Sequence, residues 1–218
     1  AIGYQIDALR HTRLSSGQMT LVDRIERSLG GVAGLFKSLL DISKLDSGSI
    51  EPRPETFVLN PFFEELVLQN EQAAFWNKVD LRLVPTSVSV RADPTLLATM
   101  VQNLLSNAIK YGRGGKVLVG VRRKGNAVSI EVHDQGIGIE AHDLPNIFDE
   151  FYRAHVAGDH DAEGVGLGLS IVRRLAELSN FSVSIDSVRG KGTSVRLSNI
   201  YVSADHVMRS VALIEEAP

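Results

Sequence analysis

The strongest local signal in this sequence is Asn103-Leu104-Leu105-Ser106-Asn107-Ala108-Ile109-Lys110-Tyr111, which predicts a helix with one polar and one apolar face. Asn103, Asn107 and Lys110 lie four and three residues apart, so they share one helix face. The apolar residues between them face a core: Leu104, Leu105 and Ala108. Amide oxygens suit Mg²⁺, and a lysine supplies a positive charge for phosphate. The stripe is therefore suited to a magnesium nucleotide, with a merely solvated helix face as the alternative.

Signals for further elements surround this helix. Asp93 and Pro94 predict its start, since Asp caps a helix and Pro suits the first helical position. Apolar periodicity predicts two more helices, at 61–75 and 169–178. Extended or alternating runs predict strands: two short segments around Pro85 within 79–90, then 117–121, 128–132, 183–185 and 195–197. Together they predict an α+β domain, an α/β sandwich with helices over one face of a mixed sheet.

Two glycine-containing motifs lie beyond the central helix. Asp134-Gln135-Gly136-Ile137-Gly138 follows a strand rich in Val and Ile. An aspartate there accepts a hydrogen bond from an exocyclic amine, and glycines let the backbone approach a flat ring, which suits adenine. Gly164-Val165-Gly166-Leu167-Gly168 runs into helix 169–178, where free N–H groups and the helix dipole favour phosphate. Each motif alone is also typical of an ordinary loop.

The three motifs occur in this order, with Phe148-Asp149-Glu150-Phe151 between the last two. In this the chain resembles the GHKL superfamily, and within it the sensor histidine kinases. Residues 103–111 match the N box of that family, 134–138 the G1 box, 148–151 the F box and 164–168 the G2 box. The resemblance covers nearly the whole chain and implies an ATP-binding domain of the Bergerat type.

The resemblance also implies a role for each matching residue. Asn107 and Asn103 would hold Mg²⁺, and Asn107 and Lys110 would be the catalytic residues, with Lys110 reaching the phosphates of ATP. Tyr111 would lie beside the purine, and Asp134 would bind the adenine amino group. The other residues assigned to ATP are Gly136, Gly138, Ile139, Gly164, Gly166, Leu167 and Gly168.

A lid over the triphosphate is a further implication of the resemblance. It would comprise Asp149 to Glu163, whose small, polar and charged residues suit a loop that becomes ordered on binding. Arg153, near its start, would touch the γ-phosphate.

The N-terminal part predicts a helical hairpin. Apolar residues spaced alternately by three and four form a heptad seam: Val22, Ile25, Leu29, Val32, Phe36 and Leu39. Ile2, Ile6 and Leu9 show the same spacing, and Ser15-Ser16-Gly17 is suited to the turn. Two such hairpins would bury the seam in a four-helix bundle, which makes the chain a homodimer. The alternative is a hairpin folded against its own globular domain.

The expected phospho-acceptor histidine has no match. In the family an acid follows this histidine and a proline comes a few residues later, whereas Thr12 follows His11. Residues 1–10 instead resemble the helix that follows the acceptor in kinases with a His-Asp-Leu-Arg-Gln-Pro motif, so we expect the sequence to begin after its own acceptor. His133, His155 and His160 lack metal-ligand spacing and are assigned no catalytic role.

The predicted organisation has four parts: a dimerisation hairpin at 1–48, a linker at 49–60, the catalytic domain at 61–200 and an extension at 201–218. Residues 211–218 are similar to the first strand and acidic pair of a receiver domain, and a terminal helix is the alternative. A receiver domain in the parent protein would make it a hybrid kinase.

Composition excludes several classes of function. The net charge of −3 comes from interspersed acids and bases, which argues against a nucleic-acid partner. Without cysteine there is no disulfide framework and no thiolate zinc site. No apolar run reaches the roughly 20 residues of a membrane span, so we expect no direct membrane contact. A cytoplasmic location fits, whether or not the parent is membrane-anchored.

The sequence thus predicts an ATP-dependent protein-histidine kinase of a two-component system. It would transfer the γ-phosphoryl group to a histidine and onward to an Asp of a response regulator or receiver domain. The alternatives are a non-catalytic dimerising scaffold and another GHKL ATPase of the chaperone, topoisomerase or mismatch-repair kind.

Overall fold

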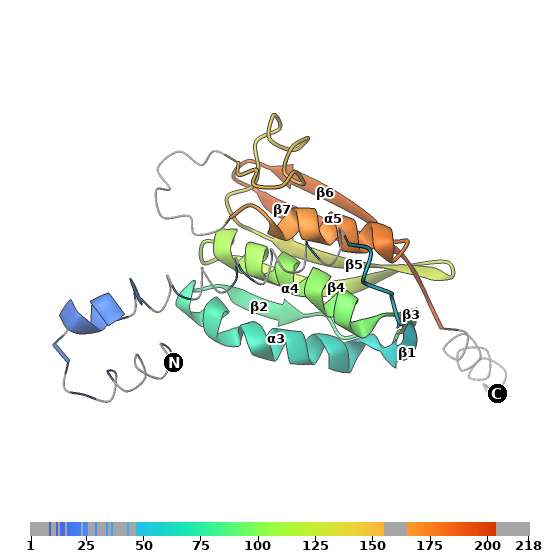
Figure 1. Cartoon of the computed structure of the whole chain (residues 1–218), viewed down its shortest axis with the longest axis horizontal. Coiled ribbons are helices and arrows are strands. Elements are labelled where there is room, and N and C mark those ends of the chain that lie inside the picture. The colour runs from blue at the N-terminus through green and yellow to red at the C-terminus, as the bar shows by residue number, and fades with distance from the viewer. Residues whose placement is uncertain are drawn as a thin grey trace, which may run out of the picture.

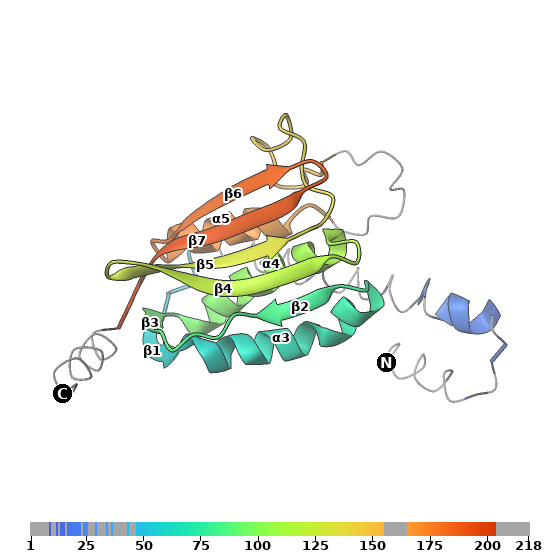
Figure 2. The ribbon, with the colours of Figure 1, turned by 180° about the vertical axis from the view of Figure 1, so that it is seen from behind.

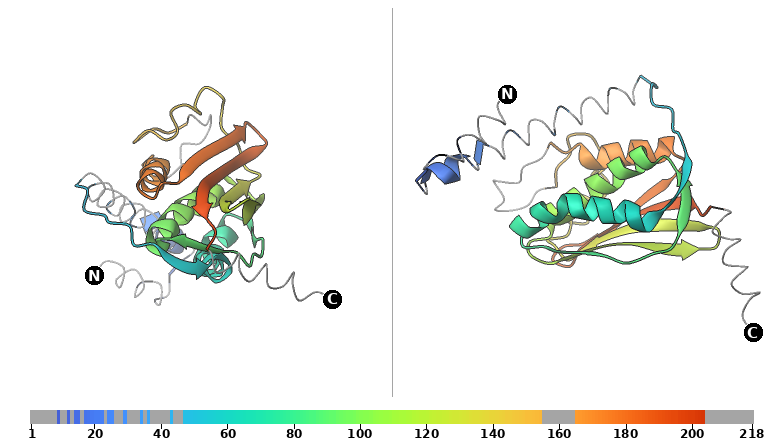
Figure 3. Two further views of the ribbon diagram at one scale, coloured as in Figure 1. Left: turned by 90° about the vertical axis from the view of Figure 1, so that its right-hand side faces the viewer. Right: turned by 90° about the horizontal axis from the view of Figure 1, so that it is seen from below.

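The computed structural model describes residues 47–154 and 165–203 without interruption, together with positions 9, 12, 14, 15, 17–22, 24, 25, 29, 34, 36 and 43. Within these residues three helices lie on one face of a five-stranded sheet (Figure 1). Figure 2 shows the opposite face of the sheet, over which none of the described helices lies. The end-on view in Figure 3 shows the helices and the sheet as two layers. The predicted α/β sandwich is therefore confirmed.

The large sheet has the strand order β2-β4-β5-β7-β6, in which β2 is parallel to β4 and the other neighbours are antiparallel. Its strands are β2 (Asp80–Leu83), β4 (Lys116–Lys124), β5 (Ala127–Asp134), β6 (Ser182–Val188) and β7 (Gly192–Tyr201). The helices are α3 (Leu59–Trp76), α4 (Pro94–Tyr111) and α5 (Gly168–Leu178). A second sheet pairs β1 (Glu55–Val58) with β3 (Ser89–Ala92). The helices and strands predicted for the α+β domain all occur, with ends that differ by a few residues.

Helix α4 lies at the centre of the helical layer, and its start is fixed as predicted. The Asp93 carboxylate accepts hydrogen bonds through Oδ1 from the backbone N–H groups of Thr95 and Leu96, at 2.9 and 3.0 Å. Its Oδ2 accepts from the backbone N–H of Arg53 at 2.8 Å. One side chain thus caps the helix and holds the segment that leads into β1.

The core lies between the helices and the sheet. Its largest fully buried side chains come from α3, α4, α5 and three strands: Leu59, Phe63, Leu97, Met100, Leu104, Leu105, Ile130, Ile171, Leu197, Ile200, Val90 and Val101. Leu104 and Leu105 are among them, so the predicted apolar face of the central helix is confirmed. None of the described helices is long and apolar enough to cross a membrane.

The linker predicted at 49–60 is corrected at its C-terminal half. Residues 55–58 form β1, which pairs with β3 from Glu55 opposite Ala92 to Val58 opposite Ser89. Leu59 begins α3 and is completely buried. The pattern-based prediction failed because four residues are too few to establish a period.

The C-terminal boundary also lies beyond position 200. Val202 forms a bridge with Val90, and the Ser203 N–H donates to the carbonyl of Ser89 at 2.9 Å. Residues 211–218, on which the prediction of a receiver domain rests, lie outside the described residues.

Most of the predicted hairpin at 1–48 also lies outside the described residues, although the described positions 17–22, 24, 25, 29, 34, 36 and 43 are helical. The hairpin and its dimer stay predictions.

Candidate functional site

The second half of α4 carries the predicted polar stripe. Asn103, Asn107 and Lys110 are half-buried on the side of the helix away from the core. The Asn103 Nδ2 donates to the carbonyl of Thr99 at 2.9 Å, which leaves its Oδ1 free to accept or to bind a cation. The Asn107 side chain makes no hydrogen bond to a described residue. The Lys110 ammonium lies 4.9 Å from the centre of the Tyr111 ring.

Asp134, the last residue of β5, is held by two backbone groups. Its Oδ1 accepts hydrogen bonds from the N–H of Gly136 at 2.8 Å and from the N–H of Thr193 at 3.2 Å. Burial raises the pKa of Asp134, and those two N–H groups partly oppose the rise. Its Oδ2 accepts no hydrogen bond from a described residue. Asp134 therefore presents one fixed acceptor atom, as binding of an exocyclic amine requires.

Two glycines in the loop after β5 allow this loop to pack closely against other backbone segments of the protein. A Cβ on Gly136 would lie 2.0 Å from the carbonyl oxygen of Tyr111, and one on Gly138 would lie 2.1 Å from that of Val188. Gly138 also has a φ of +64°. This gives both glycines a role in packing within the chain, and the sequence-based expectation that they also make room for a flat ring stays a prediction. They allow the loop to lie against the end of α4 and against β6.

The described part of the Gly164–Gly168 motif turns into α5 beside the polar stripe. Gly166 has a φ of +80°, and a Cβ there would lie 2.6 Å from the carbonyl of Tyr152. A Cβ on Gly168 would lie 3.1 Å from Oδ1 of Asn103 and 3.7 Å from Nδ2 of Asn107. No side chain caps the start of α5, so its first N–H groups are available to an anion. Gly164 lies outside the described residues.

The F box lies against α5. Phe148 is buried, with the Arg173 guanidinium 4.8 Å from the centre of its ring. The Phe151 N–H donates to the carbonyl of Gly166 at 3.1 Å, while its side chain is 60% exposed. This hydrogen bond joins the two ends of the chain that border 155–164, which lie outside the described residues. The lid and the contact of Arg153 with phosphate thus stay predictions.

These contacts bring the three motifs to one end of the sheet. Gly136 touches Tyr111, and Gly168 touches Asn103, so the loop after β5 and the turn before α5 both lie against α4. Ile139 belongs to the first of these loops, and the buried Leu167 belongs to the second. The donor set combines amide oxygens, one lysine, free helix N–H groups and a single carboxylate, which fits a magnesium nucleotide.

The sequence prediction missed the contribution of the turn between β6 and β7. The Thr193 N–H binds Asp134, and a Cβ on Gly192 would lie 2.0 Å from the Asp134 carbonyl oxygen. The Ser187 hydroxyl accepts from the N–H of Ile139 at 2.8 Å. The glycines of Gly190-Lys191-Gly192-Thr193 were a visible signal, but their partners lie about 50 to 60 residues earlier.

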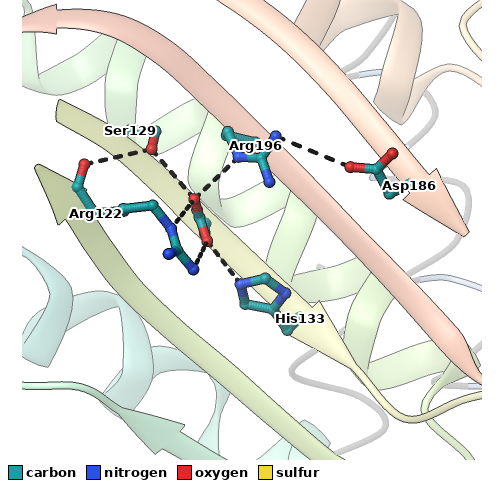
Figure 4. A network of polar contacts seen from close by, with 6 residues as sticks. Arg122, Ser129, His133, Asp186 and Arg196 are labelled. Atoms are coloured by element: carbon teal, nitrogen blue, oxygen red, sulfur yellow. Dashed lines mark hydrogen bonds and ion pairs between the residues drawn. The ribbon is translucent and has the colours of Figure 1, made fainter. Parts of the chain in front are cut away.

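Glu131 lies at the centre of a polar network on the face of the sheet opposite the helices (Figure 4). Its Oε1 accepts from Nε of both Arg122 and Arg196 at 3.0 Å, and its Oε2 lies 3.0 Å from Nε2 of His133. Burial raises the pKa of Glu131, but these partners outweigh burial and lower it to about 2. His133 contacts Glu131 rather than any of the predicted ATP-binding residues.

The described residues contain no cluster of His, Cys, Asp and Glu suited to a metal.

The Glu131 network predicts a loss of stability in acid. A carboxylate whose pKa is lower in the folded state stabilises the fold above its unfolded pKa, near 4.5, and this stabilisation disappears as the pH falls toward about 2. We expect Glu131→Gln to lower the free energy of unfolding by roughly 2 to 3 kcal/mol at pH 6 and by much less at pH 2.5. Urea unfolding across this range measures the difference. Glu177→Gln, at an exposed site on α5, is the control, and an equal loss at both pH values would contradict the prediction.

Comparison with known proteins places this arrangement in a family. Residues 92–201 match the family described as "Histidine kinase-, DNA gyrase B-, and HSP90-like ATPase". The match begins at the end of β3 and ends with β7, so it includes both loops and the whole of α4.

Two curated relatives are sensor kinases. The chain is 29% identical over 195 residues to sensor histidine kinase RcsC of Salmonella typhimurium, covering 88% of this chain and 21% of that protein. It is 34% identical over 165 residues to sensor protein kinase WalK of Staphylococcus saprophyticus, covering 74% and 27%. The chain thus spans only about a quarter of the length of these relatives.

The fold is also similar to that of a solved structure, full-length ShkA in complex with AMPPNP. The TM-score is 0.72 at 22% sequence identity, and the likeness covers 92% of this chain and 42% of ShkA.

Proposed function

Because this chain belongs to the family of histidine kinase-, DNA gyrase B- and HSP90-like ATPases, we propose that it binds ATP with Mg²⁺ and acts as the catalytic part of a protein-histidine kinase. The curated relatives are sensor kinases, which favours this branch of the family over the gyrase and chaperone branches. ShkA, which has a similar fold, was solved with the ATP analogue AMPPNP.

The observation that carries the proposal is the meeting of the three motifs on α4. A Cβ on Gly168 would lie 3.1 Å from Oδ1 of Asn103, and Gly136 lies against Tyr111. The uncapped start of α5 and the amide side chains of α4 are thus on one side of the site, and Asp134 is on the other. A nucleotide that spans the two would place its phosphates near α5 and its base near Asp134.

Each residue has a chemical role in this proposal. Asn103 and Asn107 supply the amide oxygens that hold Mg²⁺, and bound Mg²⁺ neutralises charge on the triphosphate. Lys110 adds a positive charge for the phosphates, and the first N–H groups of α5 donate to them. Asp134 accepts from the amino group of adenine. These residues thus position the nucleotide and neutralise its charge, which is what phosphoryl transfer chiefly requires of a protein.

The proposed transfer needs an acceptor histidine. Its imidazole nitrogen attacks the γ-phosphorus, the bond from that phosphorus to the bridging oxygen breaks, and ADP leaves with the electron pair. The phosphoryl group then passes from the imidazole nitrogen to a carboxylate oxygen of an Asp in a response regulator. The hairpin at 1–48 is proposed to form the dimer in which this occurs.

Calorimetric titration with AMPPNP tests the nucleotide site directly. We expect the wild-type chain to bind AMPPNP more tightly with Mg²⁺ than with EDTA. Asn107→Ala is expected to weaken the magnesium-dependent binding about tenfold, because one oxygen ligand is lost.

Asn126→Ala is the matched control, since Asn126 is an exposed residue in the turn between β4 and β5, at the opposite end of these strands from Asp134. It should bind as the wild type does. If the wild-type chain binds no nucleotide, the kinase proposal fails, and a dimerising scaffold becomes the better interpretation.

A further inference from the structure

Ser187, near the end of β6, connects parts of the chain that lie far apart in sequence. Its Oγ accepts a hydrogen bond from the N–H of Ile139 at 2.8 Å and donates to the carbonyl of Gly192 at 3.0 Å. The Oγ1 of Thr193 lies 3.0 Å from the same atom. A serine hydroxyl has one proton to donate and two lone pairs to accept with, so these three contacts use its full capacity.

The contacts of Ser187 lead to both sides of Asp134. Ile139 follows the glycine loop whose Gly136 N–H binds Oδ1 of Asp134. Thr193 is the residue whose own N–H binds the same Oδ1. One hydroxyl therefore joins the two backbone segments that hold the Asp134 carboxylate in place.

Ser187 is suited to this role because it lies on the inner side of the sheet. Ser187 is half-buried, while its strand neighbours Asp186 and Val188 are exposed. The turn beyond it already touches the loop, since the Gly190 N–H donates to the carbonyl of Ile137 at 2.7 Å. Ser187 adds a side-chain contact to this backbone contact, so that the Ser187 hydroxyl and the Asp134 carboxylate each bond to both the loop and the turn.

We propose that Ser187 is a positioning residue for selection of the base: its hydroxyl fixes the loop at 136–139 against β7, so that Oδ2 of Asp134 meets the amino group of adenine. The proposal rests on the nucleotide site described above. It assigns no contact between Ser187 and the nucleotide. Loss of the hydroxyl leaves the Ile139 N–H without its acceptor and removes the connection from the loop to Thr193 that runs through Ser187.

Adenine selectivity provides the test. Calorimetry compares ADP with inosine diphosphate, which has the same phosphates but an oxygen in place of the amino group. We expect Ser187→Ala to weaken ADP binding about tenfold and inosine diphosphate binding about twofold, so that selectivity falls about fivefold. Ser187→Thr, which keeps the hydroxyl, is expected to restore selectivity to within about twofold of the wild type.

Ser184→Ala is the matched control, because Ser184 is an exposed serine on the same strand, opposite Arg196. It should leave both affinities unchanged. Thermal unfolding checks that each variant is folded, and Ser187→Cys replaces Ser187→Ala if the latter is not.

The outcomes separate the two proposals. No ADP binding by the wild-type chain overturns both. If the wild type binds ADP and the Ser187 variant without a hydroxyl keeps its selectivity, only the role of Ser187 is overturned. Equal weakening of ADP and inosine diphosphate binding overturns it as well, since that is the effect of general loosening.

Discussion

Replacing Asp134 with Asn is expected to weaken ADP binding about a hundredfold, or about 2.7 kcal/mol, while the domain stays folded. Asn keeps an oxygen that accepts from the N–H groups of Gly136 and Thr193, at the position of Oδ1. The remaining position, Oδ2 in the wild type, becomes an NH₂ group. A donor then faces the amino group of adenine, which is also a donor.

Rotation of the amide does not rescue this variant. If the Asn side chain turned over, its NH₂ would face two backbone N–H donors, and both would lose their acceptor. The fold therefore fixes the NH₂ toward the nucleotide, and the variant should prefer inosine diphosphate, in which an exocyclic carbonyl oxygen that accepts replaces the amino group. Calorimetry with ADP and inosine diphosphate measures the change in preference.

Asp80→Asn is the control for the charge change, because the Asp80 side chain is exposed and paired with Arg82. It should keep the wild-type preference for ADP. Unchanged ADP affinity in the Asp134→Asn protein would show that this carboxylate does not contact the base.

Gly192→Ala is expected to have the largest effect on stability. Its Cβ would lie 2.0 Å from the carbonyl oxygen of Asp134 and 2.9 Å from the Cα of Gln135, both of which are backbone atoms. The φ of +100° is also unfavourable for alanine. We expect a loss of about 3 to 5 kcal/mol in the free energy of unfolding, together with weaker nucleotide binding, because the end of β5 must move.

Gly190→Ala separates the clash from the backbone strain. Gly190 lies in the same turn and has a φ of +78°, but nothing lies within 4 Å of a Cβ there. Its cost should be about 1 kcal/mol, the strain of a left-handed alanine. Urea unfolding of the two variants gives the difference, and similar losses for both would contradict the contact between Gly192 and Asp134.

Local signals predicted the central helix well. Asp93 and Pro94 mark its start, and its polar and apolar faces follow from spacing alone, so each can be read without knowledge of distant residues. The same holds for the position of Asp134 at the end of a strand. The mixed sheet with helices on one face followed from the alternation of these local patterns.

The parts that could not be predicted depend on pairing between distant segments. The partner of Asp134 in the turn is Thr193, 59 residues later, and no periodicity connects them. The requirement for glycine at position 136 comes from the carbonyl of Tyr111, which an added Cβ would meet at 2.0 Å, and no pattern in the sequence indicates this contact. The parallel pairing of β2 with β4 and the four-residue strand β1 likewise depend on tertiary contacts.

Strand β3 is a common anchor for the two ends of the domain. The chain enters through β1, which pairs with β3, and leaves at Val202, which bridges to Val90 of β3. Thr193, beside Asp134, is nine residues before this exit along an extended strand, or about 30 Å away. The segments before β1 and after Val202 thus join the domain at one end, away from Asp134. A rotation of the domain by about 10° about this end would move the Asp134 end by about 5 Å, and the same site would then face different neighbours.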